Sequence, residues 1–293
     1  MTNRSTIAVV TDSFATYSVF PGSKSLPVTV LPNRITIDGQ QYRENIDLNI
    51  DEALSLMRKV QHAPKVSPPS VSDYANAYAK IAETADGIIS IHASRGISPS
   101  WSNAQAGALQ VSHCPIMVID SRTISASQAM LVELALELVN AGESLEEIAR
   151  ILRTAVERTY SIYYVENTSF IFENRIVEPS HAILGAMVGV KPLLTVENGQ
   201  LAAMEKAKTR AQAVERLVEF AIEFADIADA VILQSKAQTS DTGKSLLERL
   251  KVETPDHVFP TAVYGASLAA LIGTDAIGLA IIEKQEMDAH DDL

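Results

Sequence analysis

At 293 residues, the chain is long enough for two domains, each with its own hydrophobic core. It has 36 acidic and 24 basic residues, a formal net charge of −12, and no cluster of Lys and Arg that could form the basic face of a nucleic-acid-binding protein. The single cysteine excludes an intrachain disulfide, the apolar stretch at the N-terminus is too short for a signal peptide, and no segment reaches the roughly 20 apolar residues of a membrane span. We therefore expect a soluble, cytoplasmic protein that handles small ligands or a partner protein.

Three apolar runs in the first half of the chain end in small polar residues. The runs, each with the polar residues that follow it, are 7–10 with Asp12 and Ser13, 88–92 with Ser94, and 116–119 with Asp120 and Ser121. Short continuous apolar runs are typical of strands in a parallel sheet that is covered by helices on both faces. Such sheets bind ligands beyond the carboxyl ends of their strands, so these residues could form a polar floor for a ligand. Asp and Ser are also common helix N-caps, and the sequence leaves both interpretations open.

Helical patterns alternate with these strands up to about residue 160. Apolar residues recur at helical spacing in four segments, 50–60, 73–85, 122–140 and 144–158. The proline-rich segment 63–72 predicts a rigid loop. Strands that alternate with helices indicate βαβ units, so we expect an α/β domain with a parallel sheet over residues 1–160.

The pattern changes after residue 160. Asn198-Gly199 lies between two expected strands and is the best short hairpin signal in the chain. The other expected strands and helices are 161–165, 178–190, 209–225, 231–234 and 240–251. A hairpin followed by helices indicates an α+β fold, so we expect a second domain over 161–293, with 264–282 packing at the interface between the domains.

Motifs of common enzyme classes are incomplete in this chain. Thr242-Gly243-Lys244-Ser245 follows an expected strand, as a phosphate-binding loop would, but Gln238 stands where that loop needs its first glycine. We interpret this segment as the start of a surface helix. The six histidines lack the spacing of a metal site, and nothing resembles the nucleophile elbow of a hydrolase. No catalytic residue or metal ligand is predicted, and His92, inside an apolar strand, is interpreted as a hydrogen-bonded core residue.

Arg175 lies between two apolar segments, 170–172 and 180–189. A guanidinium at this point is either a buried charge that needs an anion or a rim residue whose head group stays in water. By itself, the sequence favours the rim.

Taken in order, several segments resemble those of the DegV family, bacterial fatty-acid-binding proteins that serve as acyl-carrier subunits of fatty acid kinase. Thr11-Asp12-Ser13 resembles the family's opening Thr-Asp-Ser, and residues 94–104 resemble its Ser-Ser-x-Leu-Ser-Gly-Thr-Tyr-Gln-Ser-Ala loop. The further matching segments are 66–70, 118–121, 174–176, 184–194, 198–199 and 264–279. Each segment alone is a weak signal, but their order and spacing along nearly the whole chain are specific.

The resemblance implies an EDD-like α/β fold and a non-enzymatic lipid carrier without a cofactor. Its ligand would be a long-chain fatty acid, with the carboxylate near the sheet edge and the acyl chain in a tunnel between the domains. The residues expected at the head group are Ser67, Ser94, Arg95, Arg175 and Lys208, and those expected along the tunnel are Ile183, Leu184, Met187 and Val188. Ordinary core packing is the alternative for these four apolar residues. The carrier would present the carboxylate to a separate fatty acid kinase subunit.

Elementary energetics agree with such a ligand. A carboxylate that is removed from water must be hydrogen-bonded or paired with a cation. Each buried CH₂ group contributes about 0.8 kcal/mol, so an acyl chain of about 16 carbons would supply roughly 10 kcal/mol before ordering costs.

The chain departs from the family pattern at several head-group positions. Val66 replaces a threonine, Arg95 a serine and Leu271 a histidine, while Asn174 replaces a glycine and Lys208 stands at a basic position. Arg95 could replace the lost groups with a bidentate contact to a carboxylate. Because Val66 and Leu271 make the pocket less polar, a carrier of another amphipathic ligand, without a carboxylate head group, is the first alternative. A small-molecule phosphotransferase or hydrolase is the second and less favoured one.

Overall fold

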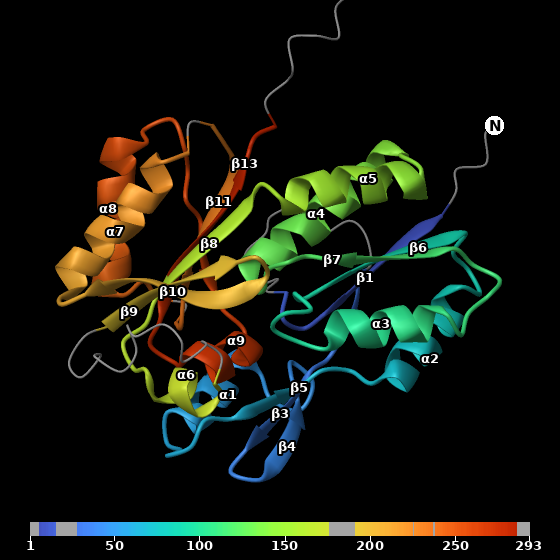
Figure 1. Ribbon diagram of the computed structural model, residues 1–293, viewed down its shortest axis with the longest axis horizontal. Coiled ribbons are helices and arrows are strands. Elements are labelled where there is room, and N and C mark those ends of the chain that lie inside the picture. The colour runs from blue at the N-terminus through green and yellow to red at the C-terminus, as the bar shows by residue number, and fades with distance from the viewer. Residues whose placement is uncertain (1–5, 16–27, 176–190, 225, 237, 286–293) are drawn as a thin grey trace, which may run out of the picture.

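The computed structural model describes residues 6–15, 28–175, 191–224, 226–236 and 238–285, which form three sheets with helices between and around them (Figure 1). The first sheet is parallel throughout, with the strand order β2-β1-β6-β7. Its strands are β1 (Ile7–Asp12), β2 (Val28–Leu31), β6 (Gly87–His92) and β7 (Ile116–Asp120). β6 is buried along its whole length, since both of its faces are covered. The parallel sheet predicted from the apolar runs is confirmed.

Helices cover both faces of the first sheet. They are α2 (Val71–Ile81) and α3 (Ser100–Ala108) on one face, and α4 (Ala126–Ala141) and α5 (Leu145–Val156) on the other. Ser70 and Ser144 are the N-caps of α2 and α5, because their hydroxyls accept hydrogen bonds from backbone N–H groups in the first turn. Gly142 ends α4 with a left-handed backbone conformation.

The second sheet has six strands in the order β10-β9-β8-β13-β11-β12. These strands are β8 (Thr159–Tyr164), β9 (Lys191–Glu197), β10 (Gln200–Ala207), β11 (Ile227–Gln234), β12 (Thr261–Val263) and β13 (Ile277–Glu283). β11 and β12 pair in parallel, and all other neighbours pair antiparallel. Two helices, α7 (Arg210–Ile222) and α8 (Asp241–Glu253), pack together on the outer face. The predicted hairpin is confirmed, with Asn198 and Gly199 at its turn.

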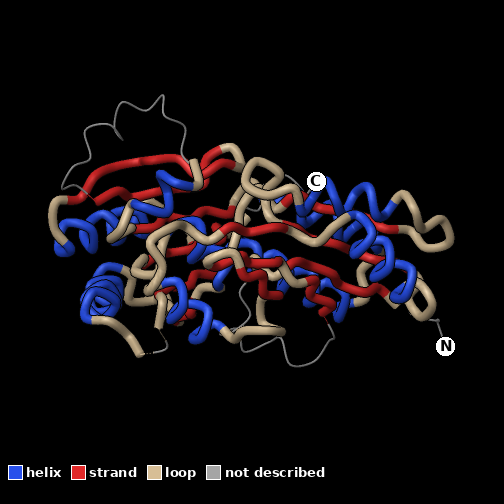
Figure 2. Tube along the Cα trace, turned by 90° about the horizontal axis from the view of Figure 1, so that it is seen from below, coloured by secondary structure: helices blue, strands red, loops and turns tan. Residues whose placement is uncertain are grey.

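Helix α4 lies between the two large sheets and joins their cores. It contacts β1 and β6 of the first sheet and β8, β11 and β13 of the second. Residues 126–132 of α4 are all buried, as expected for a helix with protein on every side. One cluster of buried apolar side chains therefore runs from Ile89 through Leu131 to Leu233 and Ala280. Figure 2, seen from below, shows the strands running along the length of the molecule with helices on the outer sides.

A third, small sheet lies beside short helices at the bottom of Figure 1. The elements of this region are β3 (Arg34–Ile37), β4 (Gln40–Arg43), β5 (Lys65–Ser67), α1 (Ile50–Met57), α6 (Ser169–Glu173) and α9 (Ala266–Ile272). The prediction of a loop throughout 63–72 is wrong in part, because residues 65–67 pair with β3. Pro64 and Pro68 flank this strand and keep it short, since proline cannot donate to a sheet.

The helices predicted from apolar spacing are present wherever the structure describes the chain, with shifted ends. α4 begins at Ala126 rather than 122, because Arg122 and Ser125 have positive φ angles outside the helical region. The helix expected over 178–190 lies outside the described residues. The last segment divides into α9, which contacts β3, β5 and α1, and β13, which lies between β8 and β11. The division into domains at residue 160 stays a prediction.

Candidate functional site

A buried hydrogen-bond network lies at the carboxyl ends of β1 and β6. Asp12 accepts from the backbone N–H groups of Phe14 and Ala93 at 3.0 and 3.1 Å, and its Oδ2 lies 2.9 Å from His92 Nδ1. The other ring nitrogen of His92 lies 2.7 Å from Ser90 Oγ. Asp12, Ser90 and His92 are fully buried. His92 is therefore a hydrogen-bonded core residue, as predicted, and Asp12 stabilises the ends of the two strands rather than facing a ligand.

Two tyrosines of α2 complete this network. The hydroxyl of Tyr78 lies 2.8 Å from Ser90 Oγ, and the hydroxyl of Tyr74 lies 3.3 Å from His92 Nδ1. Burial raises the pKa of both tyrosine hydroxyls well above the ordinary value, so both stay neutral and can donate. The network is thus a buried support beneath the loops that follow the strands.

The predicted head-group residue Ser94 contacts the tip of the β9–β10 hairpin. Its hydroxyl donates to the carbonyl of Gly199 at 2.6 Å and accepts from the N–H of Gly96 at 3.2 Å. A Cβ atom on Gly199 would lie 2.6 Å from Ser94 Oγ, and one on Gly96 would lie 2.5 Å from the Gly199 carbonyl oxygen. Both glycines are required by this close approach. Ser94 therefore links a loop of the first sheet to a hairpin of the second.

Arg95 lies at the surface beside Trp101. Its side chain is 68% exposed, and its Nε is 3.5 Å from Asp120 Oδ2. Its guanidinium carbon lies 5.7 Å from the centre of the Trp101 ring, within the range of a cation–π contact. Exposed ion pairs contribute little to stability, so the guanidinium is available to a ligand that reaches this surface.

Helix α9 brings together several of the head-group positions. It packs against β5, which ends with Ser67, and against α6, which ends shortly before Arg175. Asn174 Nδ2 donates to the carbonyl of Ala270 in α9 at 2.8 Å. Ser67 and Arg175 are exposed, and Leu271 of α9 is partly buried. Arg175 is therefore a rim residue, in agreement with the interpretation favoured by the sequence.

Partly exposed apolar side chains from four segments contact the shared core near these positions. They are Val66 of β5, Ile97 after β6, Val196 and Ala203 of the hairpin, and Leu271 of α9. Such side chains can bury the apolar part of a ligand. The predicted tunnel residues Ile183, Leu184, Met187 and Val188 lie outside the described residues, so their role stays a prediction.

Lys208 is the last of the predicted head-group residues along the chain. It follows β10 and is exposed, and its backbone N–H donates to Gln212 Oε1 at 2.9 Å. Within the described part of the chain, no hydrogen bond or ion pair joins its side chain to Ser67, Ser94 or Arg175. Its part in binding stays a prediction.

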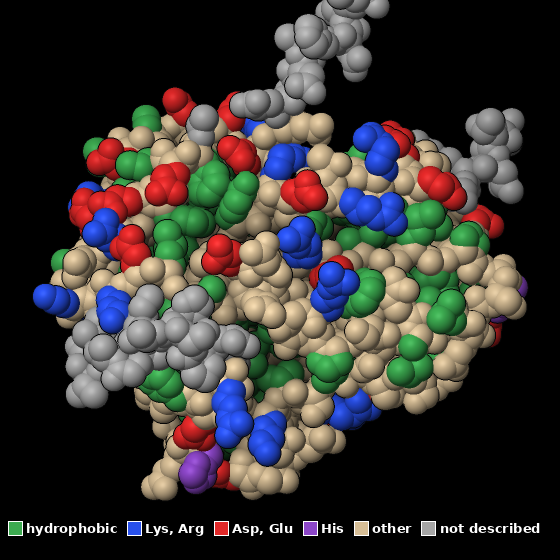
Figure 3. Space-filling view, in the orientation of Figure 1, with side chains coloured by type: hydrophobic (Ala, Val, Ile, Leu, Met, Phe, Trp, Pro, Cys, Tyr) green, Lys and Arg blue, Asp and Glu red, His purple; other side chains and the backbone are tan. Residues whose placement is uncertain are grey.

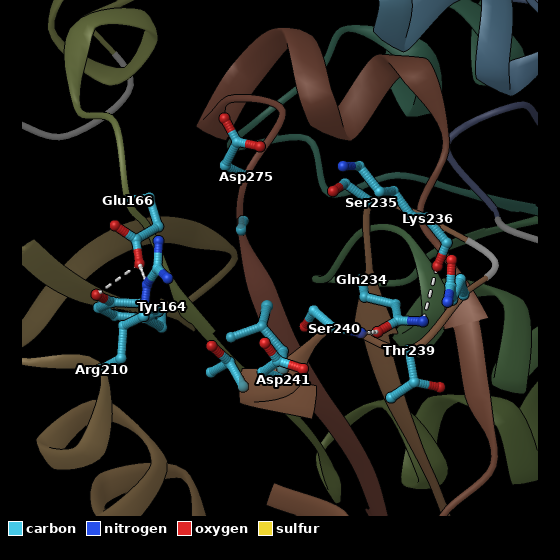
Figure 4. Close-up of a pocket in the computed structure, with 14 residues that line it drawn as sticks. Tyr164, Glu166, Arg210, Gln234, Ser235, Lys236, Thr239, Ser240, Asp241 and Asp275 are labelled. Atoms are coloured by element: carbon cyan, nitrogen blue, oxygen red, sulfur yellow. Dashed lines mark hydrogen bonds and ion pairs between the residues drawn. The ribbon is translucent and has the colours of Figure 1, made fainter. Parts of the chain in front are cut away.

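A polar cavity of about 550 Å³ opens at the carboxyl ends of β8 and β11 (Figure 4). Glu166 lies on one side, where it accepts from Tyr164 at 3.0 Å and from Arg210 Nε at 2.7 Å. Lys236 and Asp275 line the cavity as well, so carboxylates and cations are mixed along its wall. This balance of charges favours neither an anionic nor a cationic ligand.

The segment that resembled a phosphate-binding loop also borders this cavity. Ser240 is the N-cap of α8, and its hydroxyl accepts from the N–H of Gly243 at 3.1 Å. The carboxylate of Asp241 lies in the first turn of the helix. The segment is the start of a surface helix, as predicted.

The described residues show no arrangement typical of a metal site or a membrane span. Across 6–15, 28–175, 191–224, 226–236 and 238–285, no three His, Cys, Asp or Glu side chains are grouped so that they could hold a metal ion. No helix in these ranges is long and apolar enough to cross a bilayer. On the face in Figure 3, Lys and Arg side chains are scattered among Asp and Glu.

Glu44 is a buried ionisable residue that sequence reasoning missed. It lies between the end of β1 and α9, where its carboxylate accepts from the Ser13 hydroxyl at 2.6 Å and from the Ser267 N–H at 2.8 Å. It also accepts from the Ser267 hydroxyl. Burial raises the pKa of Glu44, and the hydrogen bonds from the two serines oppose that effect. Ser267 is 223 residues away in the chain, so no local pattern could reveal this contact.

Known proteins resemble this chain in sequence. A sequence model of the DegV family, described as uncharacterised protein, matches residues 6–284. Protein DegV of Bacillus subtilis is 27% identical over 278 residues, which cover 93% of this chain and 98% of that protein.

Solved structures of other proteins resemble this chain in fold. The fatty acid binding DegV family protein of Streptococcus agalactiae superposes with a TM-score of 0.87 at 25% identity, covering 95% of this chain and 99% of that one. The Fatty Acid Kinase B3 protein of Streptococcus pneumoniae, solved with linoleic acid, superposes with a TM-score of 0.81. The superposition covers 95% of this chain and all of that chain. The identity is 20%, so this likeness shows the fold alone. Because the family match extends from the first strand of the parallel sheet to the end of β13, the chain belongs to the DegV family.

Proposed function

We propose that this protein binds a long-chain fatty acid and carries it without catalysing a reaction. The observation that carries the proposal is the likeness to the S. agalactiae protein, whose name describes it as fatty acid binding. The arrangement around α9 supports it, since Ser67 and Arg175 flank a helix whose Leu271 is partly exposed and apolar. Polar groups beside apolar ones are what an amphipathic ligand requires.

In this proposal the carboxylate lies beside α9. Arg175 supplies a charge-assisted hydrogen bond and Ser67 a neutral one, and the tunnel residues expected over 183–188 bury the acyl chain. Ser94 already donates to the Gly199 carbonyl, so its hydroxyl binds the carboxylate only if it exchanges that bond. Arg95 and Lys208 are exposed and are assigned to the outer part of the head-group region.

Two measurements test fatty acid binding. Mass spectrometry of small molecules released from the denatured protein is expected to find a long-chain fatty acid in stoichiometric amount. Arg175→Ala is expected to raise the Kd for fatty acid ten-fold or more, because loss of a charge-assisted hydrogen bond costs about 1.5 kcal/mol or more. Arg150→Ala is the matched control, since Arg150 is exposed on α5 and pairs with Glu147. Absence of lipid, with no thermal shift on adding fatty acids, contradicts the proposal.

We also propose that the bound carboxylate is presented to a separate fatty acid kinase subunit in the cytoplasm, with no further cofactor. The family resemblance supports this step, and the fold shared with the S. pneumoniae protein is compatible with it. The test combines the loaded protein, ATP and a fatty acid kinase catalytic subunit. Acyl phosphate is expected when all three are present and absent when the kinase subunit is left out. Turnover by this protein alone contradicts the non-catalytic assignment.

A second candidate function is the carriage of an amphipathic ligand with an uncharged head group. Val66 and Leu271 favour it, because both are apolar side chains at positions beside the proposed head group. The same mass spectrometry distinguishes the two candidates, since an uncharged lipid would be recovered in place of a fatty acid.

A further inference from the structure

We infer that Glu44 is a positioning residue that holds α9 in place beside the head group of the bound lipid. The inference rests on the proposed function, because α9 affects binding only if the head group lies next to it. Glu44 itself is buried, so it would act on the ligand through α9 rather than from the surface.

The carboxylate of Glu44 supplies the N-terminal cap that α9 lacks in its own sequence. Gly265 stands at the N-cap position and has no side chain that could accept a hydrogen bond. Glu44 Oε1 accepts from the N–H of Ser267, in the first turn, at 2.8 Å. A Cβ atom on Gly265 would lie 2.9 Å from the same oxygen, so the start of the helix lies directly against the carboxylate. An unpaired N–H in a buried first turn is costly, and Glu44 removes that cost.

Asn33 sets the direction of the hydrogen bonds around Glu44. Its backbone N–H donates to Ser13 Oγ at 2.8 Å, and its Nδ2 donates to Ser267 Oγ at 2.9 Å. Each serine hydroxyl therefore accepts from Asn33 and donates its own proton to Glu44. The carboxylate thus receives three hydrogen bonds, which join the end of β1 and the start of α9 to the residue that follows β4.

No cation neutralises Glu44 among the described residues. Asp12, at the end of β1, is a further negative charge that acts on it. The nearby arginines have partners of their own, since Arg34 pairs with Asp73 and Arg43 pairs with Asp47. Helix α9 contains no titratable side chain. Beyond the packing of its apolar side chains, α9 is therefore held at its N-terminus by hydrogen bonds to one carboxylate rather than by an ion pair.

Movement of α9 would displace the groups proposed to bind the carboxylate. α9 packs against β5, which carries Ser67, and its Ala270 carbonyl holds Asn174, the residue before Arg175. Leu271 lies on the same helix, close to its end. A carboxylate at the N-terminus of α9 can therefore set the geometry of the proposed head-group region.

The test replaces Glu44 by its amide, Glu44→Gln. The amide has a single acceptor oxygen, so it cannot accept all three hydrogen bonds that converge on the carboxylate. We expect amide hydrogen exchange within 266–272 to accelerate at least ten-fold and the Kd for fatty acid to rise at least ten-fold. Leu250→Ala is the matched control, because Leu250 is fully buried on α8 in a separate core cluster. It should lower the melting temperature without changing either readout.

A second variant shows whether the effect passes through α9. Ser267→Ala removes one of the three donors, and its effect on Kd should not add to that of Glu44→Gln in the double variant. If Glu44→Gln matches Leu250→Ala in both exchange and affinity, the inference is overturned. If the wild-type protein binds no fatty acid, the proposed function fails, and exchange within 266–272 then decides by itself whether Glu44 holds α9.

Discussion

Glu133, on the central helix α4, is an acidic residue in an unfavourable environment. Its Oε1 atom is buried and has no hydrogen-bond partner among the described residues. Burial, followed by the nearby charges of Asp229 and Glu137, raises its pKa to about 7. A carboxyl group with a raised pKa binds its proton more tightly in the folded than in the unfolded state. The contribution of Glu133 to stability is therefore most favourable below pH 4.5 and is lost as the pH rises towards 7.

Replacement of this carboxyl group by an amide should stabilise the protein at high pH. We expect Glu133→Gln to raise the free energy of unfolding by about 1–2 kcal/mol at pH 8 and to have little effect at pH 4.5. The expected gain is this small because the side chain is partly exposed to solvent, which screens its charge. Urea denaturation at the two pH values measures the difference. Glu248→Gln, at an exposed position on α8, is the control. An equal effect of Glu133→Gln at both pH values would contradict the pKa assignment.

At the scale of single residues, the sequence predicts the role of a side chain when that role depends on neighbouring residues in the chain. The sequence predicts that His92 is a hydrogen-bonded core residue because it lies within an apolar strand. The family resemblance predicts that Ser94 lies near the head group, but its partner Gly199 comes from a hairpin that is distant in the chain. Glu44 was missed because its partners Ser13 and Ser267 are brought to it by the fold. Long-range polar contacts of this kind leave no periodic signal in the chain.

At the scale of elements, the β9–β10 hairpin is important because its tip contacts the Ser94 loop. Gly199 and Gly39 are both turn glycines with positive φ, +78° and +81°. A Cβ atom on Gly39 would meet nothing within 4 Å, whereas one on Gly199 would lie 2.6 Å from Ser94 Oγ. Both positions thus require a left-handed backbone conformation, but only a Cβ atom at position 199 would collide with another residue.

This pair predicts two different losses of stability. Gly39→Ala should lower the free energy of unfolding by about 1–2 kcal/mol, the cost of a left-handed conformation with a Cβ. Gly199→Ala should lose about 1–3 kcal/mol more, because the added methyl group must displace Ser94 or the hairpin tip. Denaturant titration of both variants tests this difference. Equal losses would mean that the hairpin tip can withdraw from Ser94 without cost.

Local sequence signals identified most elements but missed several, among them β2, α3 and the hairpin of β3 and β4. Asn198-Gly199 predicted the β9–β10 turn correctly, and Asp38-Gly39 carries the same type of signal between β3 and β4. The third sheet could therefore have been found in part from this dipeptide. β5 could not, because it is a three-residue strand between prolines and pairs with a strand far away in the chain.

At the scale of the whole molecule, the two large sheets share one apolar core through α4. Because the cluster that contains Ile89 also contains Leu233, neither sheet can lose its packing independently. We expect one cooperative unfolding transition. The single tryptophan, Trp101 of α3, reports on the outer layer of the first sheet, whereas far-ultraviolet circular dichroism reports on all elements. The two denaturation curves should coincide, and two separate midpoints would show that the halves unfold independently.

The shared core was not predictable from the sequence, although most strands of the two sheets were. In an amphipathic helix the spacing of the apolar residues shows which single face is buried. The first turns of α4 are buried on every side, so their sequence shows no such face. The same sequence over residues 126–132 would also fit a helix that is covered by a sheet on one side and by a loop on the other. The expected two-domain arrangement therefore includes this helix, at 122–140, but not its contacts with the second sheet.

The position of β13 has a consequence for how the chain folds as it is synthesised. This strand comes last among the described elements, yet it lies between β8 and β11. While a ribosome is still adding residues before Ile277, β8 and β11 have no common neighbour, and each exposes unpaired backbone groups along one edge. All strands of the parallel sheet have been synthesised once Asp120 has left the ribosome. The six-stranded sheet is complete only after Glu283 has been synthesised. Until then the nascent chain carries an open gap in its second sheet, the kind of surface that chaperones protect.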